Sequence, residues 1–273
     1  MDTVTTHRLR LFGDVSWHGA GRVLPFRPER RFQLLALLAC RCDWGTREQL
    51  AEQLWPERTP ADAKRNLRKV ILQASWLAAA LPLAPPLELQ GDRLRWAPAS
   101  DLADFLHACD AGWHAQAVQA YRPGLLDGMK AGLGEAALDW LARQRAWLEQ
   151  CWHQAVQHWL AALAHDPAAT ADAAELVLAR DPLHEATLRA LLRACTVLGE
   201  PARAQRAQQR HAHHLQQELG LAPAPDLAAA APSHAPLVPS AMPGVAPAAV
   251  HRIIEAAMDV VAAPGSSRRC CSG

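Results

Sequence analysis

Residues 59–81 read TPADAKRNLRKVILQASWLAAAL, and the organisation of the N-terminal third follows from this helical pattern. Thr59-Pro60 predicts the start of a helix, since threonine caps well and proline fits the first helical position. Pro82 predicts its end. At 100° per residue, apolar and basic residues separate onto two arcs. The apolar arc has Leu67, Val70, Ile71, Ala74, Leu77 and Leu81; the other has Arg65, Arg68, Lys69 and Gln73, with Lys64 at its flank.

The segments on either side of this helix complete a recognisable order. Alternating residues at 8–12 and an apolar run at 23–26 predict short strands, and residues 29–42 have helical spacing. A second helix is predicted over 47–55, where Thr46 and Gln49 have the spacing of a capping box. Residues 87–90 and 93–96 alternate around Gly91-Asp92, which predicts a hairpin. Strands, three helices and a hairpin indicate a winged helix-turn-helix.

The basic arc of the third helix suggests contact with double-stranded DNA. Arginine and lysine pair with phosphates or guanine, glutamine pairs with adenine, and a recognition helix presents its N-terminal residues to the bases. Residues 1–100 have a net charge of +5 and residues 101–273 a net charge of −4, consistent with a polyanion at the first part. A solvated amphipathic face remains the alternative. The predicted DNA-binding residues are Lys64, Arg65, Arg68, Lys69, Gln73, Arg93 and Arg95, the last two on the hairpin.

The remainder of the chain divides into a helical part and a tail. From residue 101 to 221 the pattern is entirely helical and alanine-rich, with breaks at 122–124, 132–134, 166–167, 181–182 and 199–201, as in a helical-repeat array. After Ala222 proline, alanine and serine dominate, although residues 250–262 have the spacing of one short helix. We therefore predict three parts: a winged helix-turn-helix at 1–98, a tetratricopeptide-like all-helical domain at 99–222, and a Pro/Ala-rich disordered tail at 223–273. The predicted fold class is mainly α.

Composition excludes several classes of protein. Half of the 273 residues are apolar, and 28 Lys and Arg nearly balance 27 Asp and Glu, unlike a histone-like protein or an acidic disordered chain. No apolar run reaches about 18 residues, and Met1–Arg10 has no signal-peptide core, so we predict a cytoplasmic protein without membrane contact. The seven irregularly spaced cysteines indicate reduced thiols.

No pattern in the chain favours catalysis, a cofactor or a metal. Neither a Ser-His-Asp arrangement nor paired carboxylates stand out, so we predict a protein that is not an enzyme. His211, His213 and His214 fall near one another on a helix, but the spacing implies no further ligand, and an exposed polar face explains them. Cys40 and Cys42 lack CxxC spacing, and burial explains Cys40 better than metal binding.

Several motifs, in the correct order, resemble those of bacterial transcription regulators. The segments 11–13, 30–38, 47–56 (REQLAEQLWP) and 63–72 resemble the OmpR/PhoB-type winged helix. The segments 121–126 (YRPGLL), 140–145 (WLARQR), 181–185 (DPLHE) and 218–225 (ELGLAPAP) resemble the bacterial transcriptional activator domain. This pairing is similar to that of SARP-type regulators. One departure follows Gln73, where many members continue with arginines but this chain reads ASWLAA.

The resemblance implies a sequence-specific regulator of transcription, and an activator in particular. It implies that the helical domain serves dimerisation, effector response or contact with the transcription machinery, so the expected partners are double-stranded DNA, a second copy of the chain and RNA polymerase. No Walker-type loop or phosphoacceptor pocket is present, so a stand-alone short form is expected. The alternative is a helical-repeat adaptor that has lost DNA binding.

Overall fold

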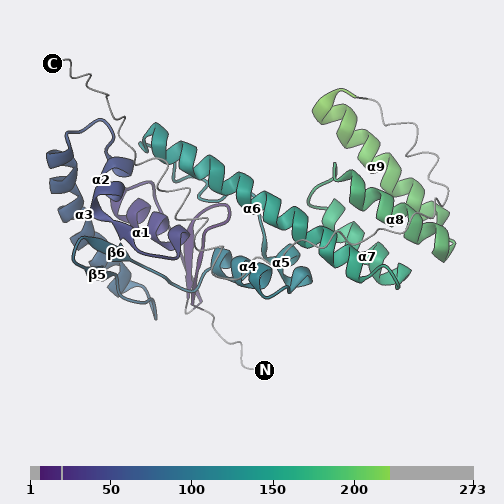
Figure 1. The fold of residues 1–273 in the computed structure, drawn as a ribbon, viewed down its shortest axis with the longest axis horizontal. Coiled ribbons are helices and arrows are strands. Elements are labelled where there is room, and N and C mark those ends of the chain that lie inside the picture. The colour runs from purple at the N-terminus through teal and green to yellow at the C-terminus, as the bar shows by residue number, and fades with distance from the viewer. Residues whose placement is uncertain (1–6, 20, 222–273) are drawn as a thin grey trace, which may run out of the picture. The chain divides into compact units, whose positions relative to one another are not determined.

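A computed structural model of the chain describes residues 7–19 and 21–221, and Figure 1 shows its helices and strands. The tail predicted for residues 223–273, including the helix predicted at 250–262, lies outside the described residues. Residues 1–230 form one compact unit, and the elements described below all belong to it.

The N-terminal strands form an antiparallel sheet. Strands β1 (Arg8–Arg10), β2 (Ser16–Gly19) and β3 (Arg22–Pro25) pair in the order β1-β2-β3. Leu9 lies opposite Trp17, and both side chains are buried. The Trp17 ring packs at 6.4 Å from the ring of Trp96, the last residue of the predicted hairpin. The sheet therefore shares its apolar side with the core that the helices cover.

Three helices and a second sheet complete the winged helix-turn-helix. The helices are α1 (Arg30–Arg41), α2 (Arg47–Leu54) and α3 (Pro60–Ala80), and Thr46 and Gln49 form the predicted capping box at the start of α2. The hairpin strands are β5 (Glu88–Gln90) and β6 (Arg93–Arg95). Fully buried leucines on these elements form the core: Leu34, Leu35, Leu38, Leu50, Leu54, Leu67 and Leu94.

A short strand that the sequence pattern did not predict joins the hairpin to α2. Strand β4 (Gly45–Thr46) pairs antiparallel with β6, which gives the sheet order β4-β6-β5. Two residues are too few to show an alternation of apolar and polar side chains. The pairing fixes the hairpin next to the N-terminus of α2, where Arg47 N–H donates to the Asp92 carbonyl at 2.8 Å.

The second part of the chain consists of helices that pack on their neighbours in sequence. They are α4 (Asp101–Asp110), α5 (His114–Ala120), α6 (Glu135–Ala162), α7 (Pro167–Leu178), α8 (Glu185–Leu198) and α9 (Pro201–Leu219). Helix α4 packs on α5, α5 on α6, α7 on α8 and α8 on α9. The predicted fold class is confirmed: a mainly α chain with an N-terminal winged helix-turn-helix followed by a tetratricopeptide-like helical domain (Figure 1).

Between α5 and α6 the predicted breaks at 122–124 and 132–134 are present, but the helical structure predicted between these two breaks is wrong. Gly124, Leu126, Gly128 and Gly132 all have φ near +55° to +84°, a left-handed conformation that a right-handed helix does not accept. Instead, this segment bridges to the N-terminal residues, with Leu125 opposite Phe12. Its conformation depends on those distant contacts, which local spacing does not record.

Buried hydrogen bonds join α1 to the segment between α5 and α6. The amide of Gln33, which is buried, donates to the carbonyls of Met129 at 2.8 Å and Ala131 at 2.9 Å. At the start of α6, a Cβ on Gly134 would lie 2.2 Å from the Pro56 ring, so only glycine allows this approach. The winged helix is therefore packed directly against the helical domain, which fixes the elements that carry the candidate site.

Candidate nucleic-acid interface

Helix α3 has the two faces that its sequence predicts. Its buried residues include Leu67, Val70, Ile71 and Ala74, while Leu77 is half-buried. The side chains on the other arc are exposed: Lys64, Arg65, Arg68, Lys69 and Gln73. The helix begins with Pro60 at its first position, and the Thr59 hydroxyl accepts from the Asp62 N–H at 3.2 Å. The basic residues thus lie on the first half of an anchored helix.

The basic side chains on this face differ in their partners. Lys64 Nζ donates to Glu48 Oε1 at 2.8 Å, and this hydrogen bond lowers the pKa of the Glu48 carboxyl. Arg65 Nη1 donates to Asp62 Oδ1 at 3.2 Å. Arg68 and Lys69 make no ion pair with any residue that the structure describes, so their charges are the ones available to a polyanion on α3.

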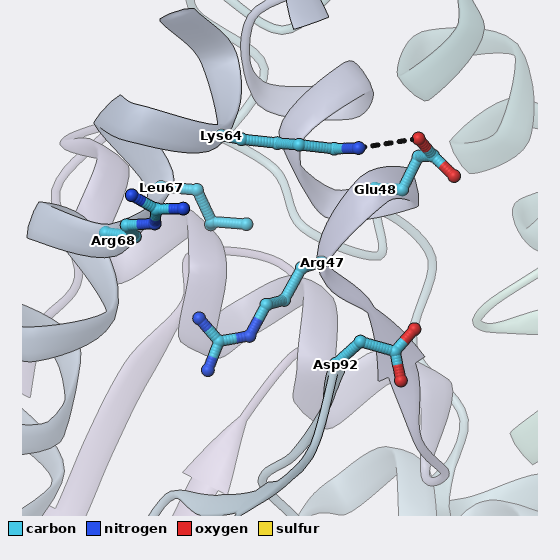
Figure 2. Close-up of a pocket in the computed structure, with 6 residues that line it drawn as sticks. All are labelled: Arg47, Glu48, Lys64, Leu67, Arg68 and Asp92. Carbon is cyan, nitrogen blue, oxygen red and sulfur yellow. Dashed lines mark hydrogen bonds and ion pairs between the residues drawn. The ribbon is translucent and has the colours of Figure 1, made fainter. Parts of the chain in front are cut away.

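Arg68 lines an open hollow of about 260 Å³ between α2, α3 and the tip of the hairpin. The other lining residues are Arg47, Glu48, Lys64, Leu67 and Asp92. Figure 2 shows the Lys64 side chain extending to Glu48, away from Arg68. Two guanidinium groups, those of Arg47 and Arg68, therefore line the hollow without a carboxylate partner in the described part of the chain.

Arg47 is the residue at this site that sequence reasoning missed. It is the first residue of α2, and its Nε is buried without a hydrogen-bond partner among the described residues. The positive end of the helix dipole also lies at a helix N-terminus. The only available sequence signal was its place directly after the capping residue Thr46. Its nearness to Arg68 depends on the packing of α2 against α3.

The two hairpin arginines have different surroundings. Arg95 Nη2 donates to both Glu88 carboxylate oxygens, at 3.0 and 2.8 Å, and its guanidinium lies 5.0 Å from the centre of the Trp44 ring. Arg93 is exposed, and its side chain has no ion-pair partner among the described residues. Of the two hairpin arginines, Arg93 is thus the one whose charge is not already paired with a carboxylate of the described residues.

On either side of Gln73 the exposed face of α3 has a large apolar side chain. Leu72 is 51% exposed and Trp76 is 65% exposed. Large apolar side chains at such exposure stand out on a helix whose opposite face is buried. The departure from an arginine-rich pattern after Gln73 therefore replaces charge by apolar surface on the same face.

Neither a metal site nor a membrane span emerges from the residues that the structure describes. No group of three or more His, Cys, Asp or Glu there could hold a metal ion. None of the described helices is both long and apolar enough to cross a membrane. The reading of the three histidines as an exposed face is wrong for His211, which is 6% exposed with its Nδ1 2.8 Å from the Pro182 carbonyl oxygen. It faces the turn between α7 and α8, where Pro182 lies.

A family model matches the helical part of the chain. Residues 101–232 match the family model of the bacterial transcriptional activator domain, which confirms the resemblance of the helical motifs. Among solved structures, the chain is similar to Mycobacterium tuberculosis EmbR in complex with a low-affinity phosphopeptide. The identity is 20% and the TM-score 0.48, over 82% of this chain and 64% of that one. A search of curated proteins found no match.

Proposed function

We propose that this chain, whose helical part is a bacterial transcriptional activator domain, is a sequence-specific DNA-binding regulator of transcription, and an activator. In this proposal the first half of α3 enters the major groove, and the hairpin β5–β6 contacts the adjacent backbone. The observation that carries it is the division of α3 into a buried apolar face and an exposed basic face.

The free charges suggest which residues read bases and which hold the backbone. Arg68 and Lys69 lie near the middle of the exposed face, where a recognition helix presents side chains to base edges. Arg47 lies across the hollow from α3 at the N-terminus of α2, a position suited to a phosphate. We assign Arg93 to a backbone contact because its side chain is exposed and unpaired in the described part of the chain.

We further propose that two copies bind one operator. A single module of this kind buries only about 600–1,000 Å² on DNA, which is typically too little for tight specific binding. Two copies would place their half-sites about 10–11 base pairs apart, or a multiple of that spacing, and the family resemblance favours tandem repeats. RNA polymerase is the proposed partner of the DNA-bound pair. A footprint of one isolated half-site with a monomer at full affinity would contradict this arrangement.

Salt-dependent binding to promoter fragments tests the proposal. We expect affinity to fall steeply with salt, because each phosphate contact releases counterions. The triple variant Arg65→Ala, Arg68→Ala and Lys69→Ala should lose specific binding while its circular dichroism stays that of the wild type. Unchanged binding of the folded triple variant would remove α3 from the interface.

One observation favours a second candidate, an interaction adaptor without DNA binding. Leu72 and Trp76 are exposed on the face that would meet DNA, and an exposed apolar group of this kind can mark a protein contact. The same titration separates the two candidates. An adaptor would bind promoter fragments no better than unrelated duplexes of the same length.

A further inference from the structure

A second basic surface lies on α9, at the other end of the described helices. An open hollow of about 600 Å³ is lined by one residue of α7, Glu175, and by five residues of α9: Arg206, Gln209, Arg210, His213 and His214. On α9 these residues recur at helical spacing, so they share one face. Neither the family match nor the similar structure assigns a role to this face.

The carboxylates near this hollow are already bound by another arginine. Arg203 Nε and Nη2 each donate to Glu175 at 3.0 Å, and Arg203 also pairs with Asp172 at 2.7 Å and Glu200 at 3.3 Å. These hydrogen bonds lower the pKa of Glu175, and the charge of Arg210 adds to the effect. Glu175 is therefore ionised and occupied by Arg203.

Arg206 and Arg210 remain as cations at the surface. Both are exposed, and neither guanidinium makes a hydrogen bond or an ion pair with the rest of the chain that the structure describes. They are four residues apart on one helix, so their Cβ atoms lie about 5–6 Å from each other. Arginine binds carboxylates in a planar, two-pronged geometry, which makes such a pair selective for two correctly spaced acids.

We propose that this face of α9 binds an acidic segment of a partner protein through Arg206 and Arg210. The matching ligand has two carboxylates at positions i and i+4 of a helix, or two residues apart in an extended strand, where the spacing is about 6.6–6.8 Å. Gln209 and His213 lie between and beside the arginines and can hydrogen bond the peptide backbone.

A protein segment fits this hollow better than a second DNA duplex. DNA carries one negative charge for about every 1.7 Å of its axis, so a protein binds it tightly through many cations that contact many phosphates. Here only two free arginines face the hollow, and the carboxylates of Asp172, Glu175 and Glu200 lie around Arg203 beside them. A short segment with two acids can pair with both arginines, while Glu175, the carboxylate that lines the hollow, stays bound to Arg203.

The test is a titration of the ¹⁵N-labelled full chain with a short alanine-based helical peptide that has glutamates at i and i+4. We expect saturable shifts of the Arg206 and Arg210 side-chain Nε–H signals. The double variant Arg206→Gln and Arg210→Gln should bind about tenfold more weakly, because two charge-assisted hydrogen-bonded pairs are lost. The variant Arg193→Gln, on an exposed position of α8 outside the hollow, should bind like the wild type.

Any of the following results would overturn the proposal. The first is equal binding of a peptide with glutamines in place of both glutamates. The second is wild-type affinity in the double variant, or no saturable binding by the wild type. The third is tighter binding of a random-sequence duplex at the same signals, which would make this face a nucleic-acid site. None of these results depends on α3, so they leave the proposed operator binding to its own test.

Discussion

Helices α3 and α9 both present exposed basic residues, but they are held in place by different means. The buried residues of α3 include large apolar side chains, Leu67, Val70 and Ile71. The buried residues of α9 are Ala207 and His211, and Arg203 ties the start of that helix to three carboxylates. The exposed basic residues of α3 are thus backed by large buried side chains, whereas those of α9 are backed by small apolar residues, His211 and the ion pairs of Arg203. Equivalent substitutions in the two helices should therefore have unequal effects.

The largest expected effect is on the buried face of α3. Leu67 is 1% exposed, so Leu67→Ala should lower the free energy of unfolding by about 2–5 kcal/mol through lost burial and a cavity. On the exposed face, Leu72→Ala should change it by less than about 0.5 kcal/mol. Urea unfolding of both variants measures the difference. Equal destabilisation would mean that α3 is not held by its apolar face.

The next effect concerns DNA affinity, which should depend on the basic residues around α3 and not on those of α9. Arg68→Ala should weaken specific binding by about 1–3 kcal/mol and relax the preference for the operator, if it reads a base. Arg47→Ala should weaken binding to all sequences alike and reduce the salt slope by about 1, as expected for a phosphate contact. Gel-shift titrations at several salt concentrations distinguish these results. Arg206→Ala on α9 is the matched control and should leave DNA affinity unchanged.

A smaller effect is expected from the ion pairs of the two helices. The Arg203 side chain is 18% exposed and meets three carboxylates, so Arg203→Ala should cost about 1 kcal/mol of stability. Arg65 has one exposed partner, Asp62, and Arg65→Ala should be close to neutral. Melting temperatures of the two variants provide the measurement. A larger loss for Arg65→Ala would reverse the proposed roles of the two arginines.

The smallest effect is a pH dependence at Glu175. Arg203 holds its pKa below the ordinary value of 4.5, so the folded state favours the ionised form. This contribution is present above pH 4.5 and is lost as the pH falls through the folded-state pKa. The stability difference between the wild type and Glu175→Gln should therefore be below about 1 kcal/mol at pH 7 and shrink towards pH 3. Urea midpoints across this range test it, and a difference that grows towards pH 3 would contradict it.

The elements that the sequence predicted well are those with local signals. Helix α3 was expected from Thr59-Pro60 to about Leu81 and spans Pro60–Ala80, because threonine, proline and the apolar arc act within one helix. The capping box of α2 was visible for the same reason. Strand β4 and the non-helical structure between the predicted breaks at 122–124 and 132–134 were not predicted, because these conformations depend on β6 and on Phe12, far away in sequence.

In the candidate site too, features with a local sequence signal were predicted and features that depend on distant contacts were not. The exposure of Lys64, Arg65, Arg68, Lys69 and Gln73 followed from helical periodicity alone. Their partners did not, since Glu48 lies on α2 and reaches Lys64 only through tertiary packing. The pairing of Arg95 with Glu88 across the hairpin was likewise missed, although β5 and β6 were expected to be neighbours. Whether these residues contact DNA stays a prediction.

The contacts of Gln33 and Leu9 mean that the peptide link between the winged helix and the helical domain is not what keeps them together. Leu9 N–H donates to the Ala99 carbonyl at 2.8 Å, Leu11 N–H donates to Asp101 Oδ1 at 2.7 Å, and Gln33 donates to two carbonyls beyond α5. A chain cleaved between Trp96 and Ser100 would thus stay associated as two complementary fragments. Fragments expressed separately should recognise each other through these same contacts and reconstitute the folded unit.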